Sequence, residues 1–257
     1  FLGDIVGNAG CNAIKKNLKK ILQSNEIDFV VDNGENSYSS GVGISENITN
    51  EMFSCGIDVI TTGNHVWDQK ETLEHIKKEN RLLRPLNMSN ELPGQGFNIY
   101  KSNNGFRVGV LNLIGNVFMK KSDNVFETSK KFLSSNKLKE NFDFLIVDFH
   151  GETTSEKMAI GHFFDGNATL VVGTHTHVPT NDSRVLEKGT AYQTDAGMCG
   201  VYDSVIGMNK EISLKRFLNI SSEKWLPARG EATICGVIVD ANADTGLAIN
   251  IKSFIYG

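Results

Sequence analysis

The sequence has few cysteines and no long apolar segment, and both absences exclude large classes of protein. The cysteines are far apart and form no C-x-x-C pair: Cys11, Cys55, Cys199 and Cys235. This scatter predicts reduced thiols in a reducing compartment. No apolar run approaches the ~20 residues that a membrane span needs. We therefore expect a cytoplasmic protein without a membrane partner. Because the chain begins at Phe1 rather than at Met, we also expect a few residues to precede it.

An excess of charge of one sign is also missing. The formal net charge is −4 at pH 7 and the pI is about 5.9, so the molecule as a whole has no strong attraction to nucleic acid or anionic membrane. Any affinity for phosphate must then come from a local site. Four lysines between residues 15 and 20 could form a nucleic-acid patch. The apolar residues Ile14, Leu18 and Ile21 share this segment at helical spacing, which favours a solvated helix face instead.

The remaining composition is that of an ordinary globular protein, with 40% hydrophobic and 22% charged residues. At 257 residues, without repeats or linkers, we expect one domain spanning residues 1–257. Strand, loop and helix signals alternate in the first third, which predicts parallel strands with crossover helices. Turn residues at 103–105 and 244–246 predict hairpins later in the chain. Together these patterns predict mixed sheets in a layered α/β domain.

Five predicted strand ends share one pattern, in which metal-capable side chains follow apolar residues within a glycine-containing turn. They are Gly3-Asp4, Gly34-Glu35-Asn36, Gly63-Asn64-His65, His150-Gly151-Glu152 and Thr174-His175-Thr176-His177. In open α/β sheets, sites form in the crevice beyond the carboxyl ends of the strands. Glycine beside a ligand lets the backbone turn sharply and approach an ion. We therefore expect these five turns to converge on one point.

The histidines are concentrated in these turns. Four of the six lie there: His65, His150, His175 and His177. An extended backbone would point His175 and His177 the same way, because they are two residues apart. The other two, His75 and His162, lie in predicted helical segments and are expected to be surface or packing residues. The combination predicts a metal site, although each turn taken alone is more often structural.

The donor atoms of this set indicate which metals would bind. Two carboxylates, amide oxygens and several imidazoles, without thiolate, suit iron, manganese or zinc. One carboxylate, Glu35 in our interpretation, could bridge two ions about 4 Å apart. Two divalent ions against Asp4 and Glu35 leave a net positive site. Such a site would attract a phosphate ester and acidify a water to hydroxide.

A nucleotide-binding loop is a competing interpretation of the first turn, because Gly3, Gly7 and Gly10 precede a predicted helix. The dinucleotide fingerprint needs G-x-G-x-x-G, and this spacing does not match it. That interpretation would also leave the histidines unexplained. We therefore favour the metal site.

The ordered motifs resemble those of the calcineurin-like metallophosphoesterases, whose signature is GD-x-H, GD-x-x-D, GNH-[DE], a later His and G-H-x-H. Three positions depart from it: Val6 replaces a histidine, Glu35 stands where an aspartate bridges, and Val66 follows His65. These departures are similar to the YmdB-like bacterial branch. That branch also shows strings resembling residues 148–152, 154–157, 173–178 and 194–198. The resemblance runs nearly from end to end.

This resemblance implies a four-layer αββα sandwich of two mixed sheets flanked by helices. It also implies a centre of two metal ions, iron first and manganese next, that hydrolyses cyclic nucleotides, 2′,3′-cyclic and also 3′,5′-cyclic. Around one ion it places Asp4, Glu35, Asn36 and His177, and around the other Glu35, Asn64, His150 and His175. His65 would protonate the leaving alkoxide, a role that suits imidazole, whose unperturbed pKa lies near neutrality.

Two other functions stay open on the sequence alone. A phosphomonoesterase such as a 5′-nucleotidase could use the same metals on a different ester. A regulatory protein could bind a nucleotide at the metal site with incidental turnover. The sequence also leaves a homo-oligomer open.

Overall fold

The computed structural model of the protein describes residues 1–89 and 91–257. The helices in these ranges are α1 (Gly7–Ser24), α2 (Glu46–Ser54), α3 (Thr72–His75), α4 (Val125–Ser135), α5 (Thr154–Phe164) and α6 (Lys210–Phe217). The first strands are β1 (Asp4–Ile5), β2 (Val31–Asn33), β3 (Val59–Thr61), β4 (Phe97–Lys101), β5 (Arg107–Ile114) and β6 (Phe144–His150). The later strands are β7 (Leu170–Thr174), β8 (Arg184–Val185), β9 (Ala191–Gln193), β10 (Met198–Gly200), β11 (Thr233–Ala241) and β12 (Ala248–Tyr256).

The strands form two mixed sheets. One has the order β4-β5-β6-β7-β9-β8, in which β5, β6, β7 and β9 are parallel and the two edge strands are antiparallel. The other has the order β1-β10-β11-β12. Leu2 bridges to both Asp32 and Gly236, so the parallel pair β2-β3 continues this second sheet. The prediction of parallel units followed by hairpins is confirmed.

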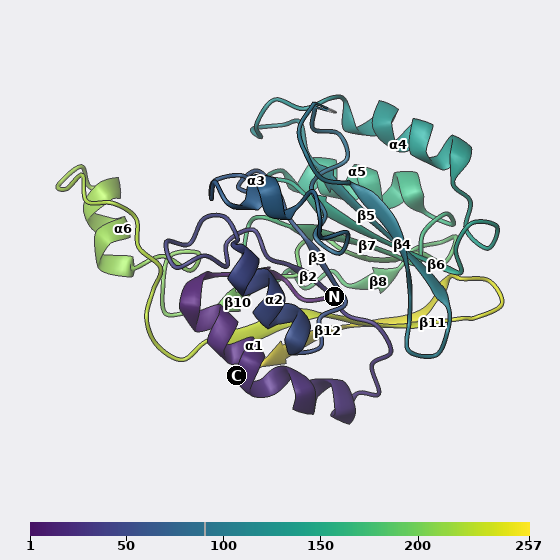
Figure 1. Cartoon of the computed structure of the whole chain (residues 1–257), viewed down its shortest axis with the longest axis horizontal. Helices are drawn as coiled ribbons and strands as arrows, with labels where there is room; N and C mark the ends of the chain where they lie inside the picture. The colour runs from purple at the N-terminus through teal and green to yellow at the C-terminus, as the bar shows by residue number, and fades with distance from the viewer. Residues whose placement is uncertain (90) are drawn as a thin grey trace.

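Helices cover the outer faces of both sheets, and the alternation of side chains along each strand explains why. On β5, Leu111 and Leu113 pack in one core with residues of α4 and α5, whereas Val108 and Val110 pack against Val31 of the other sheet. The helices α1 and α2 cover the opposite outer face, as Figure 1 shows. The layers are therefore helix, sheet, sheet and helix. The predicted αββα sandwich is confirmed.

Local sequence signals explain further features, and the two predicted hairpin turns are confirmed. Ser45, a residue type that favours the first position of a helix, caps α2 by accepting a hydrogen bond from the Ile48 amide at 3.2 Å. The turns at 103–105 and 244–246 join antiparallel strands. One boundary differs, because Asp4, which was predicted to lie in the turn after a strand, is the first residue of β1. Its side chain is fully buried.

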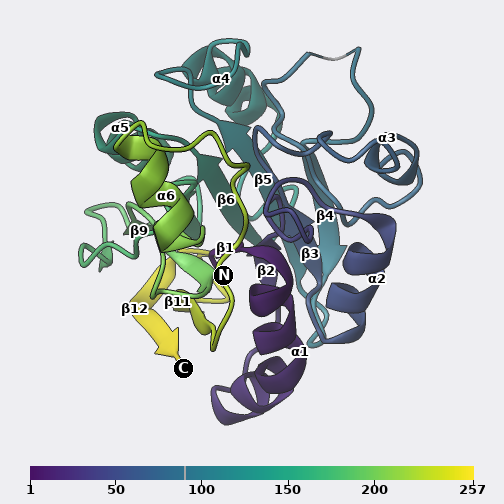
Figure 2. The same cartoon turned by 90° about the vertical axis from the view of Figure 1, so that its left-hand side faces the viewer.

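The segment around α6 stands away from the two sheets, as Figure 1 shows at the left, and in Figure 2 the same helix points towards the viewer. Its own contacts hold it together, because Phe217 and Trp225 meet edge to face and Arg216 lies over Trp225. None of the helices in the described part of the chain is long and apolar enough to cross a membrane.

Candidate metal centre

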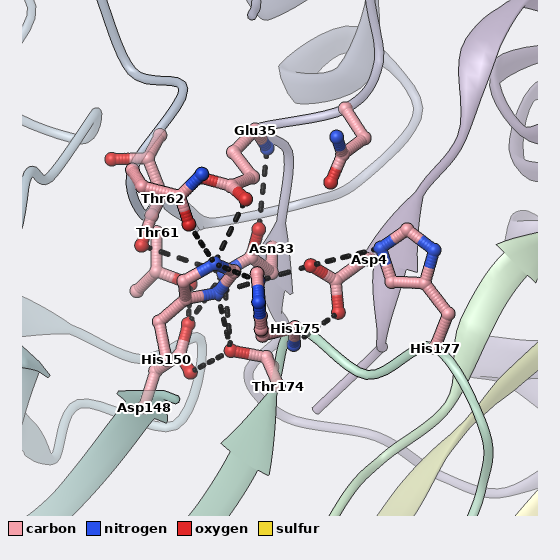
Figure 3. A network of polar contacts seen from close by, with 12 residues as sticks. Asp4, Asn33, Glu35, Thr61, Thr62, Asp148, His150, Thr174, His175 and His177 are labelled. Carbon is pink, nitrogen blue, oxygen red and sulfur yellow. Dashed lines mark hydrogen bonds and ion pairs between the residues drawn. The ribbon is translucent and has the colours of Figure 1, made fainter. Parts of the chain in front are cut away.

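The predicted turns do converge, at the carboxyl ends of the parallel strands and between the two sheets (Figure 3). His150, the last residue of β6, is the centre of the group. Its Nε2 lies 2.8 Å from Glu35 Oε1, 3.2 Å from Asn64 Oδ1 and 3.1 Å from His175 Nδ1. Glu35, His150 and His175 place one ligand atom each within 4.8 Å of one another. One part of the predicted ligand set is therefore assembled around His150.

Hydrogen bonds orient the His150 ring towards this group. Thr174 donates its hydroxyl proton to Asp148 Oδ1 at 2.7 Å, so the Thr174 hydroxyl oxygen can accept a hydrogen bond from His150 Nδ1 at 2.9 Å. In the neutral form of the ring, which is the form that binds a metal, the proton is thereby placed on Nδ1. Nε2 is left to face Glu35 and His175, which is the orientation of a metal-binding imidazole supported by a second hydrogen bond.

A second part of the set lies around Asp4, beside which Figure 3 shows His177. His177 Nδ1 donates to the Ile206 carbonyl at 2.8 Å, so its Nε2 is free and lies 3.7 Å from Asp4 Oδ1. Asp4 Oδ2 accepts from the His175 amide at 3.1 Å, but Asp4 Oδ1 is buried without a hydrogen-bond partner among the described residues. Asn36 donates to the Gly41 carbonyl at 2.8 Å, and its Oδ1 is likewise buried without a partner in residues 1–89 and 91–257.

These unpartnered oxygens test whether the site fits metal ions. A buried oxygen without a donor is costly, and a cation would satisfy it. The donors are carboxylate, amide and imidazole without thiolate, which is the chemistry of iron, manganese or zinc sites. The residues present therefore fit divalent metal ions, with Glu35 in the group around His150 and Asp4 in the group beside His177.

Charge interactions in the centre are strong. Burial alone would raise the pKa of Glu35, but attraction and a hydrogen bond from His150, together with His65, lower it to about 2. Burial opposes the charged form of His150, and Glu35 and Asp4 outweigh it, so the pKa of His150 rises to about 9. Burial and repulsion by His150 lower the pKa of His175 to about 3. His175 is therefore neutral and available as a ligand at neutral pH.

The backbone at His175 and His177 differs from the prediction. We expected an extended segment that points both side chains the same way, but their φ angles are +97° and +64°. This left-handed conformation is unfavourable for residues other than glycine and costs of order 1–3 kcal/mol each. It sends His175 towards His150 and His177 towards Asp4. The two histidines therefore serve the two parts of the set, and the interpretation as an extended pair is wrong.

His65 lies at the edge of the centre rather than inside it. Its amide donates to Glu35 Oε2 at 3.0 Å, and its ring Nδ1 lies 2.6 Å from Asp68 Oδ2. The side chain is 30% exposed, so the ring can reach a bound ligand. The sequence reasoning missed Asp68, although it lies only three residues from His65. The other two histidines lie elsewhere, as predicted, with His75 buried in α3 and His162 exposed on α5.

Close packing explains the glycine before Asn64. A Cβ atom at Gly63 would lie 2.2 Å from His150 Cδ2 and 2.5 Å from Glu35 Oε2. No side chain fits there without displacing these ligands. This close approach, rather than backbone conformation, requires glycine at this position.

A buried ion pair holds the turn of His175 and His177, and the sequence reasoning assigned it no role. Lys157 Nζ lies 2.7 Å from Asp195 Oδ2, and both side chains are at most 1% exposed. Asp195 Oδ2 also accepts from the Thr176 amide and hydroxyl at 3.1 and 2.6 Å. Both residues lie in strings that carried the family resemblance, which was the only available signal.

Asp148 holds the neighbouring strands in the same way. It accepts hydrogen bonds from side chains on three other strands: Asn33 on β2, Thr61 on β3 and Thr174 on β7. Burial raises the pKa of Asp148 to about 6, although His150 and these donors oppose the shift. The network fixes the strand ends that carry the ligands.

Comparison with known proteins agrees with this geometry. A family model described as YmdB-like protein matches residues 1–254. The chain is 38% identical to a Bacillus subtilis (strain 168) protein named 2′,3′-cyclic-nucleotide 2′-phosphodiesterase, covering 99% of this chain and 95% of that protein. It is 38% identical to a Mycoplasma pneumoniae protein named putative phosphatase/phosphodiesterase, in an alignment that covers 98% of this chain and 90% of that protein.

A solved structure is also closely similar. It is described as a novel phosphatase from Mycoplasma pneumoniae, with a TM-score of 0.91 and 37% identity over 99% of this chain and 91% of that one. The family model, the two sequence relatives and the solved structure thus match nearly the same residues of this chain. The chain therefore belongs to the YmdB-like family of phosphoesterases.

Proposed function

We propose that the protein is a metal-dependent phosphodiesterase that hydrolyses 2′,3′-cyclic nucleotides. The observation that carries this proposal is the 38% identity to the Bacillus 2′,3′-cyclic-nucleotide 2′-phosphodiesterase over 99% of the chain. The converging carboxylates, amides and imidazoles support it, because they suit a cationic centre that binds a phosphate ester.

In this proposal two ions share the ligands that the structure brings together. Asp4, Asn36 and His177 would hold one ion, and Asn64, His150 and His175 would hold the other. Glu35 would serve both ions, and the low pKa of its carboxyl keeps it ionised at neutral pH. Iron is the first expectation and manganese the second. When bound, the ions supply Lewis-acid chemistry, which lowers the pKa of water and neutralises charge on the phosphate.

The role of the protein itself is to orient the ester and to deliver a proton. In hydrolysis a water oxygen bonds to phosphorus, the bond from phosphorus to the ribose 2′ oxygen breaks, and that oxygen takes up a proton. We assign this proton to the His65 ring. The contact of 2.6 Å with Asp68 Oδ2 fixes the Nδ1 side, so the other nitrogen can face the leaving oxygen. Imidazole is suited to this transfer near neutral pH.

The test compares esters on one metal-loaded preparation. We expect hydrolysis of 2′,3′-cyclic AMP, with slower or no hydrolysis of 5′-AMP, and loss of activity in His150→Ala. Including 3′,5′-cyclic AMP measures whether the six-membered cyclic ester is also accepted. Hydrolysis of 5′-AMP alone, or unchanged activity in His150→Ala, would overturn the proposal.

A phosphomonoesterase is the second candidate. The Mycoplasma pneumoniae relative is named putative phosphatase/phosphodiesterase, and the solved structure is described as a phosphatase. A phosphomonoesterase would use the same ions, but its substrate would carry a terminal phosphate. The ratio of kcat/KM for 2′,3′-cyclic AMP to that for 5′-AMP decides between the two candidates.

A further inference from the structure

The rim of the metal centre exposes large apolar side chains. They lie on three loops and are between 44% and 86% exposed: Val117, Phe118, Val178 and Ile206. Each loop is tied to the centre through its backbone. The Gly115 amide donates to the His150 carbonyl at 2.9 Å, and the Ile206 carbonyl accepts from His177. Val178 directly follows His177. The loops that contact the polar centre therefore also carry exposed apolar side chains.

The loop that carries Phe118 joins β5 to α4 and is anchored on both sides of this residue. On one side, the Glu156 carboxylate accepts from the amides of Asn116 and Val117 at 2.9 and 3.3 Å. On the other side, Lys120 Nζ donates to the Asn64 carbonyl at 2.5 Å and lies 3.7 Å from Asp68 Oδ1. The second anchor ties the loop to the turn that carries His65. Phe118 is thus held beside the centre.

Phe118 is unfavourably placed for stability alone. At 86% it is the most exposed large apolar side chain among the residues that the structure describes. Its φ angle of +60° is in the left-handed region, which its β-carbon disfavours. Packing offsets neither the exposure nor the strain. Strained residues and exposed apolar groups concentrate at ligand sites, so both features indicate a ligand.

The ligand that fits joins a phosphate to a flat apolar group. The centre would hold the phosphate, and an exposed aromatic ring beside it offers a stacking surface. Nucleobases stack on aromatic side chains irrespective of base identity, because every base has a π face. The anchored loop fixes this surface before the ligand arrives, which lowers the entropic cost of binding.

We propose that Phe118 forms a nucleobase subsite, on which the base of the substrate stacks while its phosphate lies at the metal centre. This inference rests on the proposed phosphodiesterase function. Stacking alone does not distinguish one base from another, so the subsite accepts purines and pyrimidines alike. Lys120 and Glu156 act as positioning residues, since each holds the loop rather than the base.

The experiment compares a substrate that has a base with one that lacks it. We choose 2′,3′-cyclic AMP and glycerol 1,2-cyclic phosphate, because both are five-membered cyclic diesters with an alkoxide leaving group. In Phe118→Ala we expect KM for 2′,3′-cyclic AMP to rise roughly 5- to 150-fold, the range of base–aromatic stacking. We expect kcat/KM for the glycerol ester to change by less than about twofold, because it makes no stacking contact. Phe118→Trp should retain tight binding.

A binding measurement separates affinity from turnover. Titration calorimetry with 3′-AMP should show the same weakening in Phe118→Ala, in both metal-loaded and metal-depleted protein. The matched control is Phe217→Ala, which removes a 72% exposed phenylalanine from the projecting helix α6. It should leave both substrates and 3′-AMP binding unchanged.

The outcomes distinguish this inference from the function on which it rests. If the unmodified protein hydrolyses neither diester, the proposed function fails and the subsite fails with it. If it hydrolyses both, and Phe118→Ala affects the two substrates equally or neither, the subsite alone is overturned. Loss of binding in Phe217→Ala to the same degree would also overturn it.

Discussion

The buried pair of Lys157 and Asp195 leads to a prediction that joins stability to the metal centre. Substitution of Lys157 by Met keeps an unbranched side chain but leaves the Asp195 carboxylate without its cation. Breaking a buried ion pair on one side costs about 3–5 kcal/mol. Asp195 keeps the donors of Thr176 and a 2.8 Å hydrogen bond from the Gly197 amide. We therefore expect a loss near the lower end, about 3 kcal/mol.

The same substitution should weaken metal binding, because Thr176 lies between His175 and His177 and depends on Asp195 for its position. Losing an outer support of a metal ligand typically lowers metal affinity by about 10–100-fold. The assays are urea unfolding for the free energy of unfolding and competition with a chelator for metal affinity. The control is Lys130→Met, which makes the same change at an exposed position of α4.

A double substitution sharpens this test. Lys157→Met combined with Asp195→Asn removes both charges and should recover part of the lost stability, because no unpaired charge stays buried. If Lys157→Met behaved like Lys130→Met in both assays, the pair would not support the turn. If the double variant lost more unfolding free energy than the two single variants lose together, unpaired charge would not be the cause of the loss.

Further predictions concern residues in or beside the centre. Glu35→Gln should lose more metal than His150→Ala or His175→Ala, because Glu35 is proposed to serve both ions; full metal content would show that another residue is the bridge. His65→Ala should keep its metals and slow 2′,3′-cyclic AMP hydrolysis by about 10²–10⁴-fold, with a smaller loss on a nitrophenyl diester whose leaving group needs no proton. Equal losses on both esters would contradict the acid role. Gly63→Ala should lower metal content without loss of secondary structure, since its Cβ would meet His150 and Glu35; normal metal content measured by elemental analysis would contradict this.

Much of the fold followed from local signals in the sequence. The Ser45 cap and the two hairpin turns depend on residues that are neighbours in the chain, so the sequence states them directly. The convergence of the ligands followed from a rule of α/β sheets, that strand ends meet at one edge. The short strands β8, β9 and β10 have two or three residues each, too few for a periodic pattern.

The support of the centre could not be predicted in the same way. Lys157 and Asp195 are 38 residues apart, and Asn33 and Asp148 are 115 apart, so only the tertiary fold makes them partners. The left-handed backbone at His175 and His177 has the same origin, because hydrogen bonds to Asp4, Asp195 and Ile206 hold a conformation that the local sequence disfavours.

The central claim is that two bound metal ions make the site active, and one titration tests it most directly. The protein is stripped with a chelator, and iron(II) or manganese(II) is added back in measured equivalents while 2′,3′-cyclic AMP hydrolysis is followed. We predict no turnover in the stripped protein and a rise that saturates at two equivalents per chain, because the ligands form one group around His150 and another around Asp4. Turnover that survives stripping, or that is complete after one equivalent, would contradict the account.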